Sequence, residues 1–285
     1  MKFPENFFDE EVRCGYLVTS QMKKIWACQL EMLAKFKEVC DKYGLTFWLE
    51  SGTLIGAVRH KGYIPWDDDI DVFVPREDYD RLLKIYEDSA QYKLFSFEKD
   101  GKFHYPFAKL CDMSTKKILP EFRSCDAIPG VEIDVFPLDC WNSNYEKAHK
   151  EARSISRDLL FLQASQYTKS PVKNKFKSFV WQLVSVYARL RTSNHFKKKI
   201  ICKSKANQQD NPAYVGCKSW CIYGEREIIP AEVFADTVDV EFEGEKFKAP
   251  IGYDTYLRSL YGDYEKDPPL EKQKTHHTFT AYKIT

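Results

Sequence analysis

The sequence predicts an α+β fold in which helices flank a mixed β-sheet core and a basic helical segment is inserted, and three observations predict it. Short apolar strands alternate with amphipathic helices along the 285 residues. Residues 47–76, FWLESGTLIGAVRHKGYIPWDDDIDVFVPR, read as a strand, a glycine turn, a short helix and an acidic strand in succession. Residues 159–209 contain no Asp or Glu, although the net charge of the whole chain is only +1. The first two observations favour a sheet with helices, and the third marks the basic segment.

The first elements lead into a candidate phosphate site. A long helix is expected over residues 20–43, because apolar residues recur every three or four positions and Gly44 stands where a helix stops. A strand over residues 45–49 and a glycine turn follow, and then a short helix over residues 54–58. Free backbone N–H groups and the positive end of the helix dipole at such a turn favour a phosphate, although an ordinary helix start is the alternative. The predicted substrate contacts are Ser51, Gly52 and Thr53.

The acidic strand is a candidate metal site. Apolar residues occupy every second position of residues 70–74, so Asp69 and Asp71 are expected on the opposite face of the strand. Mg²⁺ takes one or two carboxylates and completes its coordination with water and substrate phosphate. We therefore predict a Mg²⁺ site here, with Mn²⁺ as the alternative ion. Asp67 has the same parity and is expected as an outer ligand, or as a replacement for one of the two if the register shifts.

Three other interpretations of this acidic string fit less well. A calcium loop needs glycine where Val72 stands and a glutamate where Asp78 stands. The aspartate-rich signature of polyprenyl synthases works on a helix, whereas residues 71–75 have the composition of a strand. A solvated acidic loop explains the charge but leaves the interleaved apolar residues unexplained.

A cationic corner joins the short helix to the acidic strand. Next to a metal and a phosphate, its residues are candidate phosphate contacts. The alternative is a solvated helix end, where positive charge suits the helix dipole. The residues are Arg59, His60 and Lys61.

The next predicted elements are a scaffold helix over residues 77–89 and short strands within residues 92–122, with a turn at Asp100 and Gly101. A further apolar strand over residues 131–137 carries Asp134. A carboxylate among β-branched neighbours is costly unless it is paired, hydrogen bonded or bound to metal.

Two more acids lie on or near that strand. Glu132 shares the strand face of Asp134 and is its substitute as a site residue. Asp139, which follows Pro137, is expected to cap a helix or turn.

The acid-free segment is expected to be helical and basic. Two interpretations compete: the apolar face of a helix near residues 176–190 packs on the core, or the basic face lies against an anionic membrane or a phosphate-rich polymer. The expected apolar face comprises Phe176, Phe179, Val180, Leu183, Val184, Tyr187 and Leu190. The basic residues of the segment are Lys169, Lys173, Lys175, Lys177, Arg189, Arg191, Lys197, Lys198, Lys199, Lys203 and Lys205.

The chain after residue 212 carries no evident catalytic group. A hairpin with its turn at Gly244 is expected over residues 242–247, followed by a helix that opens at Asp254. His276 and His277 are expected to be tail residues rather than catalysts.

Composition narrows the class of protein. The low net charge argues against a nucleic-acid partner. No apolar run reaches the length of a membrane span, about 18 residues, and residues 1–20 lack the apolar core of a signal peptide. A cytoplasmic location is therefore expected. If the basic segment binds the membrane, the protein would lie at its inner face. The nine cysteines lack the spacing of a zinc site and are expected to be reduced, mostly buried thiols.

Four blocks of the chain carry a family resemblance. They read SGTLIGAVRHKGYIPWDDDIDVFVPREDYDRL at 51–82, HYPFAKLCDMST at 104–115, GVEIDVFPLD at 130–139 and FEGEKFKAPIGYDTYLRSLYGDYEKDPP at 242–269. Together they closely resemble the LicD-type phosphocholine transferase family, related to the fukutin-type ribitol-phosphate transferases of the nucleotidyltransferase superfamily. The resemblance implies one domain over residues 1–285, with a nucleotidyltransferase-like core at 20–149, the basic helical insertion at 150–212 and a segment at 213–285 that folds back on the core.

The resemblance also implies an activity and roles for the site residues. It implies transfer of a phospho-alcohol, foremost phosphocholine from CDP-choline, to a hydroxyl of a cell-surface glycan such as teichoic acid or lipopolysaccharide, or of its lipid-linked precursor, with release of CMP. Asp69 and Asp71 would hold one or two Mg²⁺ ions, and Asp134 would complete the metal site or activate the acceptor hydroxyl. Lys109 would contact substrate, with a lysine on an edge strand as the alternative. Trp66 is among the aromatic residues that could surround a choline group.

Two rival functions are distinguishable. A nucleotidyltransferase that uses a nucleoside triphosphate would release pyrophosphate instead of CMP. A non-catalytic adaptor that holds a glycopolymer at the membrane would have no need of a costly carboxylate cluster, which argues against it.

Overall fold

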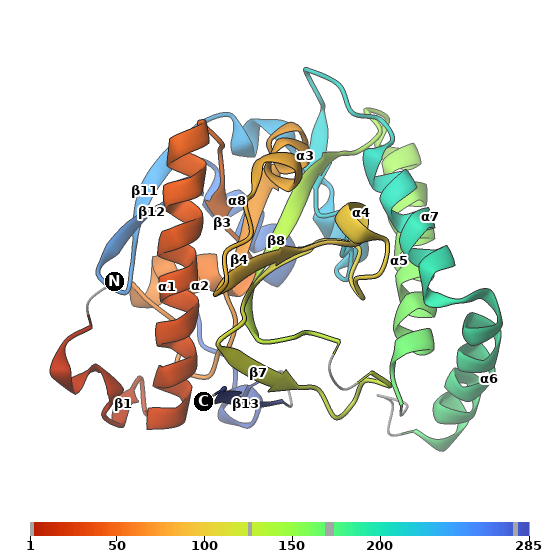
Figure 1. Cartoon of the computed structure of the whole chain (residues 1–285). Helices are drawn as coiled ribbons and strands as arrows, with labels where there is room; N and C mark the ends of the chain where they lie inside the picture. Colours follow the sequence, from red (N-terminus) through yellow and green to blue (C-terminus); the bar gives the residue numbers. More distant parts are fainter. Residues whose placement is uncertain (1–2, 125–126, 169–173, 276–278, 285) are drawn as a thin grey trace.

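The computed structural model describes residues 3–124, 127–168, 174–275 and 279–284, and for residues 175–177 the description is of the backbone. A seven-stranded mixed sheet lies at the centre of the molecule, with helices around it (Figure 1). This architecture confirms the expected α+β fold. The strands of the sheet are β3 (Trp48–Leu49), β4 (Asp71–Pro75), β5 (Tyr92–Phe95), β6 (Ala108–Asp112), β8 (Val131–Cys140), β9 (Tyr214–Gly216) and β10 (Ile229–Pro230).

The long strand β8 organises the sheet. It runs parallel to β4 on one side, and on the other side it pairs antiparallel with β6 through its first half and with β9 through its end. Strand β3 extends the sheet beyond β4, β5 beyond β6, and β10 beyond β9, each of them antiparallel to its neighbour. The parallel pair β4–β8 therefore lies in the interior of the sheet.

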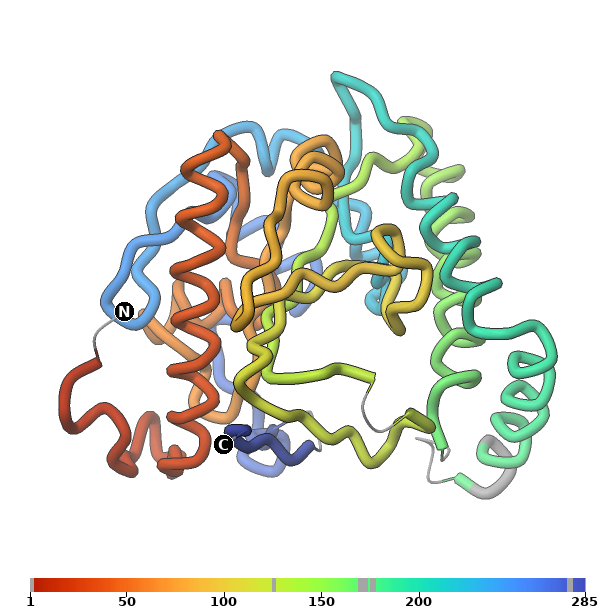
Figure 2. Tube along the Cα trace, in the orientation of Figure 1, coloured from red at the N-terminus to blue at the C-terminus, as the bar shows by residue number. Residues whose placement is uncertain are grey.

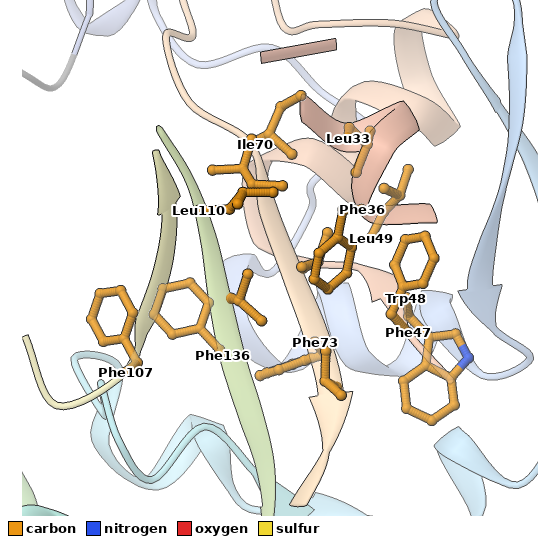
Figure 3. Packing of buried hydrophobic residues seen from close by; sticks show 14 of the residues in the cluster. Leu33, Phe36, Phe47, Trp48, Leu49, Ile70, Phe73, Phe107, Leu110 and Phe136 are labelled. Carbon is orange, nitrogen blue, oxygen red and sulfur yellow. The ribbon is translucent and has the colours of Figure 1, made fainter. Parts of the chain in front are cut away.

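Different helices cover the two faces of this pair. The helix α1 (Ser20–Tyr43) crosses one face, and Figure 3 shows its Leu33 and Phe36 in the main core with Ile70. On the other face, Phe73 packs against Tyr256 of α8 (Tyr253–Tyr261), with ring centroids 5.9 Å apart. The helix predicted over residues 20–43 is confirmed as α1.

Gly44 caps α1 in the left-handed conformation, with φ of 61°. The predicted hairpin is also confirmed: its two-residue turn, Glu243 and Gly244, has positive φ at both positions.

The remaining elements surround the sheet, and Figure 2 shows how the last strand, β13 (Thr280–Lys283), returns beside β7 (Thr115–Ile118). The other helices are α2 (Ser51–His60), α3 (Arg76–Ile85), α4 (Phe97–Asp100), α5 (Tyr145–Gln166), α6 (Lys175–Arg191) and α7 (Ser193–Lys205). Three small antiparallel sheets pair β1 (Glu11–Arg13) with β2 (Tyr16–Val18), β7 (Thr115–Ile118) with β13 (Thr280–Lys283), and β11 (Thr237–Phe242) with β12 (Glu245–Pro250). Short 3₁₀ helices are η1 (Glu5–Phe8), η2 (Gly224–Glu227), η3 (Ala231–Phe234) and η4 (Leu270–Lys272).

Some local predictions were wrong. The strand expected over residues 45–49 is reduced to Trp48 and Leu49, and the turn expected at Asp100 and Gly101 is the end of the one-turn helix α4.

Asp139 is not a cap. It is buried within β8, where its carboxylate accepts a hydrogen bond of 2.7 Å from Nε of Arg76. A buried guanidinium requires such a partner, and nothing in the local sequence around Asp139 shows it.

The helices α5, α6 and α7 pack around a second, smaller core on the side of the molecule away from α1 (Figure 1). The expectation that α6 packs its broad apolar face on the core was wrong. Its inward side is instead a narrow stripe that includes Trp181, Ser185 and Ala188. The small side chains of this stripe allow close approach to a neighbouring helix. Exposed apolar residues of α6 are Phe179, Val180, Leu183, Val186, Tyr187 and Leu190.

Several basic residues of this segment are occupied within the fold. Lys199 and Lys203 pair with Asp158, and Lys205 pairs with Glu98. Among the described residues, no helix is long and apolar enough to cross a bilayer. Four residues named above lie outside the described part of the chain: Lys169, Lys173, His276 and His277.

Candidate active site

A cavity of about 720 Å³ opens on the face of β4 and β8 that carries Asp71 and Asp134. Its walls come from the start of α2, the acidic loop before β4, the segment around η2, and the chain that follows α8. Six of its lining side chains are aspartates, and four of them, Asp67, Asp69, Asp71 and Asp134, lie on or next to the sheet. The cavity therefore collects carboxylates from segments that are far apart in the sequence.

The start of α2 forms one wall. Ser51 adopts a left-handed conformation with φ of 44°, which is strained for a residue other than glycine and is typical of functional sites. A side chain at Gly52 would place its Cβ 2.7 Å from Oδ2 of Asp67, so only glycine lets the carboxylate approach the helix. Ser51 and Gly52 line the cavity, where the free N–H groups of a helix start can bind an anion. The hydroxyl of Thr53 instead accepts the N–H of Asp71 at 2.9 Å and anchors β4.

The acidic loop is held from behind by α1. Nε1 of Trp26 donates to the carbonyl of Asp67, and Nε2 of Gln29 donates to the carbonyl of Asp68, each at 2.9 Å. Carboxylate oxygens of Asp67, Asp68 and Asp69 lie within 4.8 Å of one another. Because β4 begins at Asp71, Asp69 precedes the strand instead of belonging to it. Both Asp69 and Asp71 nevertheless line the cavity.

A row of charged residues crosses three strands. Asp71 of β4 is the register partner of Asp134 of β8, and Asp134 is in turn the partner of Lys109 of β6. Nζ of Lys109 donates to Oδ1 of Asp134 at 2.5 Å. Glu132 is engaged by Nζ of Lys117 at 2.6 Å, and it does not line the cavity. Lys109 is buried in an interior strand, so the alternative of a lysine on an edge strand was wrong.

Burial and mutual repulsion shift the pKa values of these acids. Burial and then Asp69 raise the pKa of Asp67 and of Asp71 well above the usual value. Burial raises the pKa of Asp134 to about 6, although Lys109 opposes the shift. Burial likewise lowers the pKa of Lys109, but Asp134 and Glu132 raise it well above its usual value.

This donor set fits a divalent cation. The ligand atoms are carboxylate oxygens, which suit hard ions such as Mg²⁺ and Mn²⁺. Among the described residues that line the cavity, the positive charges are those of Arg59 and Lys266, so the aspartates outnumber the cations. The aspartate group Asp67–Asp69 is the one cluster of potential metal ligands found in the described part of the chain.

Within the cationic corner, Arg59 lies at the cavity and Lys61 lies at the surface. Arg59 lines the cavity, and its guanidinium donates to the carbonyl of Tyr264 at 2.6 Å and pairs with Asp267 at 3.1 Å. It thereby holds the segment after α8 against the site. His60 approaches the same Asp267 at 3.7 Å, and burial and then Arg59 lower its pKa. Lys61 is largely exposed and faces Glu241. Neither His60 nor Lys61 lines the cavity.

Trp66 is buried and lines the cavity, as the residues after α8 also do. Sequence reasoning assigned no role to four other lining residues: Glu50, Tyr223, Glu227 and Tyr261. The one sequence signal for Glu50 is its position directly before the glycine turn. Around η2 no periodic pattern marks Tyr223 or Glu227.

Comparison with known proteins finds relatives that the same family model describes. The family model described as LicD/FKTN/FKRP, nucleotidyltransferase domain, matches residues 44–161. Over 269 residues the chain is 31% identical to the lipopolysaccharide cholinephosphotransferase LicD of Haemophilus influenzae. The aligned stretch covers 89% of this chain and 94% of that protein. A 40-residue stretch, 14% of this chain and 8% of the relative, is 48% identical to the ribitol 5-phosphate transferase FKRP of Homo sapiens.

Proposed function

The chain belongs to the LicD family, and from this premise we propose that it transfers phosphocholine from CDP-choline to a hydroxyl of a cell-surface glycan or of its lipid-linked precursor, releasing CMP. Its named relatives are phosphotransferases, and so is this chain. The observation that carries the proposal is the register of Asp71 with Asp134 at the wall of a cavity that also holds the start of α2. Carboxylates for a cation and N–H groups for a phosphate are thus brought together.

Each part of the site has a role in this reaction. The backbone at Ser51 and Gly52 would orient the diphosphate of the donor. Asp69, Asp71 and Asp134, with Asp67 beside them, would hold Mg²⁺ or Mn²⁺. The bound ion would neutralise charge that develops on the departing CMP.

Asp134 has a second available role. With a pKa of about 6, its carboxylate is ionised at neutral pH and is basic enough to accept the proton of an acceptor hydroxyl. Lys109 would act as a positioning residue, because it fixes the Asp134 carboxylate from the side.

The test is product analysis with two donors. The purified chain is incubated with Mg²⁺ and an acceptor extract, and with either CDP-choline or CTP. We expect Mg²⁺-dependent CMP release from CDP-choline and no pyrophosphate from CTP. Pyrophosphate release would instead identify a nucleotidyltransferase, and the absence of both products would favour a non-catalytic adaptor.

The exposed face of α6 supports a further partner, the surface of an anionic lipid bilayer. This face consists of Phe179, Val180, Leu183, Val186, Tyr187 and Leu190. A large apolar helix face beside basic residues is typical of helices that lie in the bilayer interface. Arg189, Arg191 and Lys198 are exposed in the same region, and residues 159–209 hold no acid to repel anionic lipid. Contact here would hold the enzyme at the cytoplasmic face of the membrane, near a lipid-linked acceptor.

Vesicle co-sedimentation tests this contact. We expect binding to phosphatidylglycerol-containing vesicles that weakens with salt and is lost when Leu183→Ser and Leu190→Ser are combined. Gln182→Ala, an exposed polar position on the same helix, is the control. Equal binding by the double variant, or a stable dimer that covers this face, would contradict the proposal.

A further inference from the structure

Two buried acids of the cavity lack a basic partner. Glu50 and Glu227 are 4% and 2% exposed, both line the cavity, and neither forms an ion pair with any described residue. The carboxylate of Glu50 accepts hydrogen bonds of 2.5 Å from the hydroxyls of Ser51 and Tyr256. Oε2 of Glu227 has no hydrogen-bond partner among the described residues. A buried carboxyl oxygen left in this state is costly, which points to a missing ligand.

Repulsion between the two acids adds to this cost. Burial and then Glu50 raise the pKa of Glu227 well above its usual value. A cation bound beside them would remove this repulsion.

Aromatic rings line the same cavity. The rings of Tyr223 and Tyr261 lie nearly perpendicular, at 71°, with centroids 5.3 Å apart, and their hydroxyls are 3.2 Å apart. Trp220 also lines the cavity, and it is held in place by Phe107 at 5.3 Å. Perpendicular rings present two different walls to one ligand. With Glu227 they provide the components of an aromatic cage, in which ring faces and a carboxylate attract a cation.

We propose that Glu227, Tyr223, Tyr261 and Trp220 bind the quaternary ammonium group of the donor's alcohol, an inference that rests on the proposed function. A quaternary ammonium is large, weakly hydrated and without N–H groups, so it gains from ring faces and a nearby carboxylate. A small metal ion would prefer the aspartate group, whose oxygens already converge. An uncharged polyol would bring no positive charge to the buried carboxyl of Glu227.

Donor selectivity tests the proposal in the unmodified enzyme. CMP release is measured with CDP-choline and with CDP-glycerol, whose alcohol is uncharged. We expect kcat/KM to favour CDP-choline by about 30-fold. Equal kcat/KM values for the two donors would overturn the cage and leave the proposed transfer reaction intact.

Variants assign the selectivity to these residues. Glu227→Gln should lower kcat/KM for CDP-choline by about 10- to 30-fold and leave CDP-glycerol nearly unchanged. Glu225→Gln, an exposed glutamate of the same 3₁₀ helix, is the matched control. Tyr261→Phe keeps the ring and should keep the preference, whereas Tyr261→Leu should lose it. If Glu227→Gln fails to fold, the two Tyr261 variants decide.

Binding measurements distinguish failure of the cage from failure of the proposed transfer reaction. Calorimetry compares the binding of CDP-choline and CDP-glycerol to the same proteins. Tighter binding of CDP-choline, lost in Glu227→Gln, supports the cage even if no CMP is released, in which case the transfer reaction is what fails. Equal binding of both donors overturns the cage.

Discussion

Asp71 on β4 and Asp134 on β8 stand opposite each other in the parallel strand pair inside the sheet. Their side chains belong to the same sheet face, and both line the cavity beside the start of α2. Lys109 on β6 continues this row on the far side of Asp134. The backbone register therefore sets the spacing of Asp71 and Asp134, whereas Asp67 and Asp69 come from the loop before β4.

Lys109 should matter through Asp134. In Lys109→Met the carboxylates of Asp134 and Glu132 lose a shared buried cation, so Asp134 loses its fixed orientation and its pKa rises. We expect CMP release at pH 7 to fall about 10- to 100-fold, with part of the loss recovered at higher pH. The pH–rate profile is the measurement, and Lys102→Met, an exposed position, is the control. An unchanged profile would contradict this role.

Stability without metal should fall as pH rises. The folded-state pKa values are raised to about 6 for Asp134 and about 7 for Glu50, both chiefly by burial. The folded state thus binds more protons than the unfolded state, whose carboxyls titrate near pH 4, and stability decreases between about pH 4 and 7.

Thermal unfolding in chelator from pH 5 to 8 measures this slope. Mg²⁺ should raise Tm more at pH 8 than at pH 5, because it binds ionised carboxylates. A Tm that rises with pH in chelator would contradict the burial of these acids.

The buried pair of Arg76 and Asp139 should be a structural requirement. Arg76→Met leaves the Asp139 carboxyl buried without its cation, and we expect the free energy of unfolding to fall by about 3–5 kcal/mol. Arg81→Met, which breaks an exposed pair with Asp78, should cost less than about 1 kcal/mol. Urea unfolding measures both variants, and similar values would show that the buried pair has no special weight.

The sequence predicts the parts of this fold that depend on local patterns. The period of apolar residues and Gly44 determine α1, and the hairpin turn at Gly244 follows from its residues. The apolar strand patterns also led to Asp71 and Asp134 as candidates. Their register across the sheet is a tertiary property that only the structure describes.

Other features depend on contacts between distant segments. Asp139 and Arg76 are 63 residues apart, so a buried partner could not be inferred from the neighbours of either residue. Glu227 and Tyr223 lie around a 3₁₀ helix without periodicity, and they enter the cavity only because the chain after β9 returns to it. For α6, the pattern shows an apolar stripe but not which side other helices cover.

The central claim is that Asp69, Asp71 and Asp134 support a metal-dependent transfer reaction. Its most direct test is Mg²⁺-dependent CMP release from CDP-choline by the wild type, Asp69→Asn, Asp71→Asn and Asp134→Asn, with the exposed Asp210→Asn as control. The account predicts that wild type and control release CMP, that each of the three variants loses about 10³-fold in rate, and that all remain folded by circular dichroism. Near-normal CMP release by folded Asp71→Asn or Asp69→Asn would contradict it.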